Sequence, residues 1–323
     1  MAKIFVTRKI PEVGIALLRE AGHEVDVSDK DGVLTPAELE ASLMAQPYDG
    51  VVSLLTDAIT GELLAKVPTV RIVANYAVGF NNIDVASAKE RGIVVTNTPG
   101  VLSTAVAEFT MALLLAVSKR VVEADNFTRA GKFVGWAPEL LLGLTLQGKT
   151  LGIVGAGRIG QEVAKRAKEG FAMKVIYYDV VQNEELEKNF GCQYCSTIEE
   201  LLKEADIVSL HVPLLDSTKH LITKERLQMM KSTAYLINTA RGPLIDEVAL
   251  VEALQNQVIA GAGLDVYEYE PKLTAGLSTC ANVVLAPHIA SATHEARMEM
   301  SKMVAQNLND FFAGNTPPNI VTV

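Results

Sequence analysis

Short apolar runs alternate with amphipathic stretches along the whole chain. In the N-terminal third, these runs predict strands at Lys3–Val6, Glu24–Val27, Gly50–Ser53, Arg71–Ala74 and Ile93–Val95. A second series is predicted at Thr150–Val154, Lys174–Tyr178, Ile207–Leu210, Tyr235–Asn238, Gly261–Leu264 and Val283–Leu285. Helical patterns lie between them; Thr35-Pro36-Ala37-Glu38 opens one helix and Asp246–Gln255 is another. This alternation is typical of α/β proteins with doubly wound parallel sheets.

Two proline-containing breaks suggest how the chain divides. Thr98-Pro99-Gly100 precedes a long helical stretch, Ser103 to Arg129, and Ala286-Pro287 precedes a final helix, Thr293 to Phe312. A length of 323 residues suits two domains better than one. We therefore predict that residues 100–287 are inserted into a domain made of residues 1–99 and 288–323, with a hinge and a cleft where the chain crosses.

Composition and charge exclude several kinds of partner. The net charge is -9 without any basic block, so nucleic acid and anionic membranes are poor partners. The start, MAKIFVTRKIP, lacks the apolar stretch of a signal peptide, and no apolar run approaches the roughly 18 residues of a membrane helix. A cytoplasmic location is expected. Cys192 and Cys195 have CxxC spacing but no second pair or nearby histidine, so ordinary thiols and no metal site are predicted.

A glycine-rich turn follows the predicted strand Thr150–Val154. The motif G-x-G-x-x-G consists of Gly155, Gly157 and Gly160, with Arg158 and Ile159 inside it, and the next strand ends in Asp179, about 20 residues further on. This context predicts a dinucleotide site with the pyrophosphate at a helix N-terminus. Asp179 can accept hydrogen bonds from ribose hydroxyls and would repel a 2′-phosphate, which favours NAD(H) over NADP(H). Residues 100–287 are therefore predicted to bind the dinucleotide, and the other domain the substrate.

Three reactive side chains follow later strands of the same predicted sheet, where ligands of such sheets lie. Arg241 follows Tyr235–Asn238, Glu270 follows Gly261–Leu264, and His288 follows Val283–Leu285. Together they suit hydride transfer to a ketone. His288 could deliver the proton, Glu270 could fix its tautomer and favour imidazolium, and Arg241 could bind a neighbouring carboxylate.

Each of these residues also has a purely structural interpretation. His288 could be a loop histidine bonded to backbone, Glu270 a solvated acid, and Arg241 a strand cap or a partner of Asp246. Their joint placement beside a cofactor motif favours catalysis.

These segments resemble the D-isomer-specific 2-hydroxyacid dehydrogenases over essentially the whole chain. The resemblance rests on GAGRIG with Asp179, and on INTARGPLIDE, GLDVYEYEP and APHIASAT. It implies that Arg241 binds the substrate carboxylate, that Glu270 and His288 form the acid/base pair, and that Asp265 lies at the nicotinamide end. It further implies that Pro213, Thr239 and Ala240 line the cofactor site. Flavodoxin-like and Rossmann-like domains that close over the substrate, and a homodimer, are also implied.

The N-terminal part is similar to the glyoxylate/hydroxypyruvate reductase branch of that family. Asn75 to Asp84 looks like the family's substrate loop, in which the N–H groups of Val78 and Gly79 would bind the carboxylate. Leu54–Asp57 and Gly135–Pro138 look like segments of this branch, in which the tryptophan matching Trp136 reaches the neighbouring subunit's active site. The chain departs from the pattern at Phe80-Asn81, where Tyr-Asp is common.

The resulting interpretation is NADH-dependent reduction of a small 2-ketoacid, glyoxylate or hydroxypyruvate, to the D-2-hydroxyacid. Two alternatives stay open. One is a reductase for a longer acid, such as 2-ketogluconate or a branched 2-ketoacid. The other is a non-catalytic NAD-sensing corepressor, because the same fold serves that role.

Overall fold

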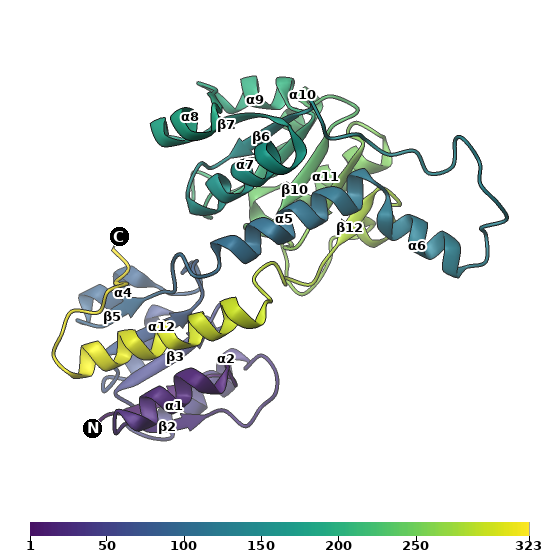
Figure 1. The fold of residues 1–323 in the computed structure, drawn as a ribbon. Coiled ribbons are helices and arrows are strands. Elements are labelled where there is room, and N and C mark those ends of the chain that lie inside the picture. The colour runs from purple at the N-terminus through teal and green to yellow at the C-terminus, as the bar shows by residue number, and fades with distance from the viewer. Residues whose placement is uncertain (323) are drawn as a thin grey trace. The chain divides into compact units, whose positions relative to one another are not determined.

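A computed structural model describes residues 1–322, and the chain forms two compact units (Figure 1). Unit 1 comprises Met1–Leu102 and the segment from Ala292 onward, and unit 2 comprises Ser103–Ser291. Both divisions fall a few residues later than the predicted boundaries at 99/100 and 287/288. The second differs because backbone N–H groups of residues 288–290 bond to Asp265, which holds His288 in unit 2.

Unit 1 is built on a parallel sheet with the strand order β2-β1-β3-β4-β5. The strands are β1 (Lys3–Val6), β2 (Glu24–Val27), β3 (Gly50–Leu54), β4 (Ile72–Tyr76) and β5 (Val94–Thr96). The helices are α1 (Glu12–Glu20), α2 (Pro36–Met44), α3 (Gly61–Lys66), α4 (Val85–Glu90) and α12 (His294–Phe312). All strand pairs are parallel, as the apolar runs predict.

The final helix, α12, packs against α1 (Figure 1). It also packs against β4. Its Ser301 hydroxyl donates to the Pro11 carbonyl at 2.7 Å and accepts from the Gly14 N–H at 3.2 Å. A β-carbon at Gly14 would lie 2.3 Å from the Ser301 carbonyl oxygen, so the two helices can approach this closely only with glycine there.

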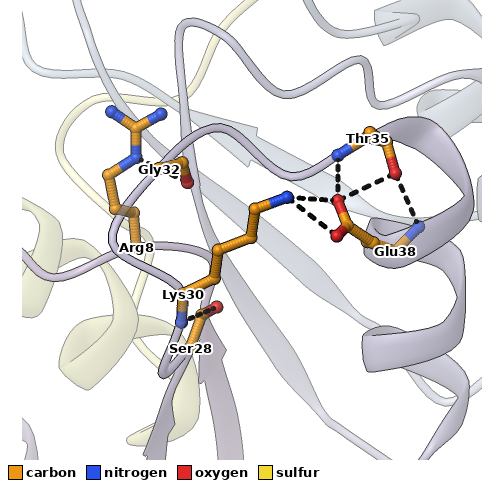
Figure 2. A network of polar contacts seen from close by, with 6 residues as sticks. All are labelled: Arg8, Ser28, Lys30, Gly32, Thr35 and Glu38. Carbon is orange, nitrogen blue, oxygen red and sulfur yellow. Dashed lines mark hydrogen bonds and ion pairs between the residues drawn. The ribbon is translucent and has the colours of Figure 1, made fainter.

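The N-terminus of α2 has the capping box expected from Thr35-Pro36-Ala37-Glu38. Figure 2 shows Glu38 accepting hydrogen bonds from the Thr35 N–H at 2.7 Å and from the Lys30 ammonium at 2.6 Å. These bonds, that of Lys30 first, lower the pKa of Glu38 to about 2. The segment between β2 and α2 is thereby tied to the helix by charged contacts, and the Arg8 Nε–H donates to the Gly32 carbonyl at 3.2 Å.

Unit 2 contains a longer parallel sheet with the order β12-β11-β10-β9-β6-β7-β8. Its strands are β6 (Thr150–Val154), β7 (Lys174–Tyr178), β8 (Gln193–Tyr194), β9 (Ile207–Leu210), β10 (Tyr235–Asn238), β11 (Gly261–Leu264) and β12 (Val283–Leu285). The short edge strand β8 was not predicted, because two residues carry no periodic signal. The fold class is confirmed: two parallel-sheet α/β units form the chain.

The helices of unit 2 lie between its strands or precede them. They are α5 (Ser103–Ser118), α6 (Val121–Arg129), α7 (Arg158–Phe171), α8 (Glu184–Phe190), α9 (Ile198–Glu204), α10 (Lys224–Met229) and α11 (Glu247–Gln255). There are also two single turns of 3-10 helix. η1 (Gly242–Leu244) follows β10, and η2 (Leu277–Thr279) precedes β12.

The single helix predicted from Ser103 to Arg129 is wrong, because the chain turns between α5 and α6. Arg120 adopts a left-handed conformation with φ 56°, and its guanidinium pairs with Glu123 at 2.8 Å. No glycine or proline marks this turn, so the apolar pattern runs through it. The apolar face of α5 is buried against α7, β10 and β11. Within residues 1–322, no helix is long and apolar enough to cross a membrane.

Candidate active site

The candidate site of unit 2 lies at the carboxyl edge of its sheet. Because the strands are parallel, the turns that follow β6, β7, β9, β10, β11 and β12 all reach this same edge. The predicted cofactor motif follows β6, Asp179 follows β7, and Arg241, Glu270 and His288 follow β10, β11 and β12. The topology therefore brings the predicted cofactor motif, Asp179 and the three predicted catalytic side chains to one edge of the sheet.

The three motif glycines meet three different surroundings. Gly155 has φ +100°, and a β-carbon there would lie 2.7 Å from the His211 carbonyl carbon. A β-carbon at Gly160 would lie 2.1 Å from the Gly155 carbonyl oxygen, so the start of α7 can pack on the turn only with glycine. Gly157 is the N-cap of α7, and a β-carbon there would meet nothing within 4 Å. The space beyond Gly157 is thus open where an anion would approach the helix N-terminus, which fits a pyrophosphate.

Asp179 lies beside this turn and is held in place by backbone. Its Oδ2 accepts from the Ala156 N–H at 2.7 Å, and its Oδ1 accepts from the Val180 N–H at 2.7 Å. A carboxylate offers about four acceptor positions, so each oxygen can still accept from a ribose hydroxyl.

A hollow of about 470 Å³ opens at Asp179. Its lining residues are Ala156, Gly157, Asp179, Val181, Gln182, Asn183, Glu184 and Glu185. The side chain of Asn183 connects its two walls, since its Nδ2 donates to the Ala156 carbonyl at 3.0 Å and its Oδ1 caps α8. The charged residues of this lining are all acidic, which fits ribose hydroxyls better than an added phosphate.

Arg241 stands at the end of β10 in a turn organised by Asn238. The Asn238 side chain, which is fully buried, donates to the Arg241 carbonyl at 2.8 Å and accepts from the Ala240 N–H at 3.0 Å. The Arg241 Nη1 donates to the Ala240 carbonyl at 2.7 Å. Burial lowers the pKa of Arg241 and the charge of Glu270 opposes this, but the guanidinium keeps its charge at any physiological pH.

His288 and Glu270 form a direct pair. The His288 Nδ1–H donates to Glu270 Oε2 at 2.9 Å, and the other carboxylate oxygen accepts from the Tyr267 N–H at 3.0 Å. Burial alone would raise the pKa of Glu270, but the hydrogen bond and charge of His288 outweigh it, and the pKa lies below its ordinary value. The side chains are 25% and 31% exposed, so both are accessible to a small molecule.

Asp265 anchors the backbone that carries His288. Its carbonyl accepts from the His288 N–H at 2.9 Å, and its carboxylate oxygens accept from the N–H groups of Ile289 and Ala290 at 2.8 Å each. His288 itself has φ 56°, a conformation that non-glycine residues adopt rarely and often at functional sites. Asp265 is fully buried, and burial raises its pKa against these backbone bonds.

The other predicted cofactor positions occupy the same edge. Thr239 is buried, and its hydroxyl shares a 2.8 Å hydrogen bond with that of Thr110 on α5. Pro213 is exposed after β9, and its carbonyl accepts from the Thr218 hydroxyl at 2.7 Å. Arg158 and Ile159 form the first turn of α7, Arg158 exposed and Ile159 half-buried.

Two predicted substrate positions belong to unit 1. Val78 and Gly79 follow β4, and their carbonyls accept from Asn97 at 2.8 Å and Asn75 at 2.9 Å. Asn75 also bonds to Asn82 at 3.1 Å, so side-chain amides shape the loop from inside. The N–H groups of Val78 and Gly79 donate no hydrogen bond within residues 1–322.

The third predicted substrate position, Trp136, lies in unit 2, between α6 and β6. Its side chain is 84% exposed, and it lies outside the strand-end turns that carry Arg241, Glu270 and His288.

Sequence reasoning missed the contacts that hold the site together. The roles of Asn238 in the Arg241 turn and of Asp265 under His288 were not predicted. Tyr267 was also missed; its hydroxyl donates to the Ala286 carbonyl at 2.8 Å and ties the loop after β11 to the one after β12. An asparagine at a strand end is the one local signal among these, since asparagine commonly bonds to nearby backbone.

Comparisons with known proteins agree with this geometry. Residues 111–290 match the model of the D-isomer specific 2-hydroxyacid dehydrogenase, NAD binding domain. A glyoxylate reductase of Thermococcus litoralis is 51% identical over 99% of this chain and 96% of its own length. A Thermus thermophilus crystal structure has a TM-score of 0.91 and 44% identity, covering 99% of this chain and all of that one.

A further solved structure is an NADPH-dependent glyoxylate/hydroxypyruvate reductase of Sinorhizobium meliloti in complex with NADP and malonate. It has a TM-score of 0.85 and 33% identity over 99% of this chain and 97% of that one. The matched family model and the full-length relatives lead to one conclusion: the chain belongs to the D-isomer-specific 2-hydroxyacid dehydrogenase family, whose NAD-binding domain indicates a nicotinamide cofactor.

Proposed function

We propose that this protein reduces glyoxylate and hydroxypyruvate to D-2-hydroxyacids with NADH. The observation that carries the proposal is the His288–Glu270 pair at the strand ends that also carry Arg241 and the glycine turn. The glyoxylate reductase name of the Thermococcus litoralis relative supports the choice of substrate.

Arg241 is proposed to bind the carboxylate of the 2-ketoacid. A guanidinium matches a carboxylate with two parallel hydrogen bonds, and the buried Asn238 side chain keeps its backbone from moving. The N–H groups of Val78 and Gly79 are proposed as further donors to that carboxylate, since a turn of successive N–H groups favours anions. Fixing the carboxylate orients the neighbouring ketone.

His288 is proposed to give its proton to the ketone oxygen as negative charge develops there. Bound NADH would supply the hydride. The Glu270 carboxylate accepts the Nδ1–H, so the opposite ring nitrogen is the one that faces the reaction. Because the pKa of Glu270 is below its ordinary value, Glu270 stays ionised at neutral pH and stabilises the protonated imidazole.

The proposed cofactor preference is NAD(H) over NADP(H). Gly155, Gly157 and Gly160, with the first N–H groups of α7 at Arg158 and Ile159, would hold the pyrophosphate. Pro213, Thr239, Ala240 and Asp265 are the positions proposed to line the rest of the cofactor site. Asp179, with Glu184 and Glu185 nearby, would repel a 2′-phosphate. The proposed preference for NAD(H) differs from that of the Sinorhizobium meliloti relative, which is NADPH-dependent.

The protein is further proposed to be a cytoplasmic homodimer. Exposed apolar side chains gather on α6 and the segment after it: Val121, Val122, Phe133, Val134, Trp136, Leu140 and Leu142. Apolar surface of this extent favours association with a partner. Free thiols at Cys192, Cys195 and Cys280 suit a reducing compartment.

Turnover of a 2-ketoacid panel tests the proposed function directly. We expect NADH oxidation with glyoxylate and hydroxypyruvate, slower turnover of 2-ketogluconate and branched 2-ketoacids, and lower kcat/KM with NADPH.

Asp179→Ala should lower kcat/KM for NADH by about 10- to 100-fold, because one charged hydrogen bond is lost. The variant should also show a smaller difference in kcat/KM between NADH and NADPH. Binding of NADH without turnover of any acid would favour a sensing protein, and equal efficiency with both cofactors would refute the role of Asp179.

Arg241→Lys should separate substrate binding from cofactor binding. Lysine keeps the charge but loses the planar two-pronged geometry. Losing two charged hydrogen bonds costs about 3–5 kcal/mol at the transition state, so kcat/KM for glyoxylate should fall on the order of 10²–10⁴-fold. NADH affinity, followed by fluorescence titration without substrate, should change far less. Collapse of NADH affinity with surviving catalysis would make Arg241 a cofactor or structural residue.

Glu270→Gln should change the pH dependence of ketone reduction. Reduction requires a proton on His288, so the rate falls as pH rises. The negative charge of Glu270 favours the protonated ring, and glutamine removes that charge while keeping the shape. The fall in kcat/KM for glyoxylate should therefore begin at lower pH in the variant. A superimposable pH profile would show that Glu270 and His288 are not coupled during catalysis.

The assembly is expected to be a dimer at assay concentration. Light scattering measures it, and Val134→Glu should weaken the dimer because Val134 is 97% exposed within the proposed interface. Val248→Glu, which places the same charge at an exposed position of α11, serves as the matched control. A fully active monomer would contradict the proposed dimer, and with it the expectation that Trp136 reaches a neighbouring subunit's active site.

A further inference from the structure

A second polar network lies beside the catalytic pair and is not used by the mechanism above. It consists of Glu247, Glu268 and His220, which we call the loop clamp. Glu247 is the first residue of α11 and is 2% exposed, and the Glu268 side chain is 8% exposed. Buried carboxylates are rare unless they are well paired, so their contacts are informative.

Glu247 and Glu268 form a reciprocal pair, in which each carboxylate accepts the backbone N–H of the other residue. The Glu247 N–H donates to Glu268 Oε2 at 3.3 Å, and the Glu268 N–H donates to Glu247 Oε1 at 3.3 Å. Glu268 thereby satisfies an N–H at the N-terminus of α11, where negative charge is also favoured by the helix dipole. The loop after β11 is joined to the start of α11 by this reciprocal pair.

The loop clamp holds the loop after β11 at two positions, one before Glu270 and one after it. Glu247 Oε2 accepts from the Thr274 N–H at 3.2 Å and also from the Thr274 hydroxyl. Glu268 precedes Glu270 and Thr274 follows it, so the segment that carries the catalytic carboxylate is fixed at both ends. The Glu270 side chain itself is also held, because the Tyr267 N–H donates to Glu270 Oε1 at 3.0 Å.

His220 connects the clamp to the turn that follows Arg241. Its Nε2–H donates to Glu268 Oε1 at 2.7 Å, and its backbone N–H donates to the Pro243 carbonyl at 2.8 Å. The backbones of the two catalytic loops also touch, because a β-carbon at Gly242 would lie 1.9 Å from the Tyr267 carbonyl carbon. The Arg241 turn and the Glu270 loop are thus in contact, but the Arg241 turn also has its own hydrogen bonds with the Asn238 side chain.

We propose that Glu247, Glu268 and His220 are positioning residues that set the place of Glu270, and through it the orientation of the His288 ring. The proposal rests on the proposed function of the His288–Glu270 pair. Loosening the clamp should lower turnover while leaving ligand binding intact, because the Arg241 turn keeps its bonds with Asn238 and the glycine turn keeps its bond to Asp179. Misplacement of a reacting group by about 1 Å can cost on the order of 10²-fold in rate.

Glu268→Gln in the full chain tests this inference. We expect kcat for glyoxylate to fall about 10- to 100-fold, with the KM for glyoxylate and the NADH dissociation constant within about twofold of the unmutated values. The matched control is Glu252→Gln, which removes a carboxylate of α11 that pairs with the exposed Lys224 at 2.7 Å, and kcat should not change. An unchanged kcat together with a lower melting temperature would reduce the clamp to a structural role and overturn the proposal.

A spectroscopic measurement tests the same point without turnover. The imidazole nitrogen resonances of His288, assigned by their loss in His288→Gln, should move in Glu268→Gln and stay in place in Glu252→Gln. If the unmutated protein turned over no 2-ketoacid, the proposed function would fail while these resonances still decided the positioning. If Glu268→Gln does not fold, His220→Gln removes the half-exposed outer member and should move the same resonances. Unmoved resonances in a folded clamp variant refute the proposal.

Discussion

The site in unit 2 depends on one buried carboxylate, that of Asp265. It accepts backbone N–H groups from Ile289 and Ala290, and its own carbonyl accepts that of His288. These bonds hold His288 at φ 56°, where an ordinary side chain is disfavoured by roughly 1–3 kcal/mol. Hydrogen bonds to a charged group contribute about 1.5–3 kcal/mol each, so two of them are sufficient to hold that conformation. Asp265 therefore places the backbone from which the imidazole reaches Glu270.

Close backbone contact is the second constraint on this edge of the sheet. Gly160 packs on Gly155 and Gly242 packs on Tyr267, in both cases closer than any β-carbon would permit. The first contact leaves the N-terminus of α7 open in front of Gly157, and the second brings the Arg241 turn against the loop of Glu270. Glycine is required there for proximity rather than flexibility. Replacement by alanine would separate the elements that the chemistry needs together.

Most of the fold could be predicted from the sequence, because buried parallel strands read as continuous apolar runs. β6, β7, β9, β10, β11 and β12 begin and end where those runs do. The turn at Arg120 could not be predicted, since its left-handed residue is neither glycine nor asparagine.

The candidate catalytic side chains could also be predicted, because strand ends of one sheet must converge. The residues that hold these side chains in place could not be assigned that role from the sequence. Asp265 finds its partners in a different loop, and Glu247 finds Glu268 and Thr274 through tertiary packing. No local pattern encodes such pairs.

The same edge of the sheet carries opposite charges for two different tasks. Asp179 follows β7 and Arg241 follows β10, with β6 and β9 between them in the strand order. Three inter-strand spacings of about 4.8 Å separate the two by roughly 14 Å, which exceeds a Debye length of about 8 Å at physiological ionic strength. The acidic end can therefore repel a 2′-phosphate without weakening the attraction of Arg241 for a carboxylate. A net charge of -9 is compatible with an anionic substrate for the same reason. The surface carboxylates are screened by salt, whereas the half-buried guanidinium acts at contact distance, where screening is weak.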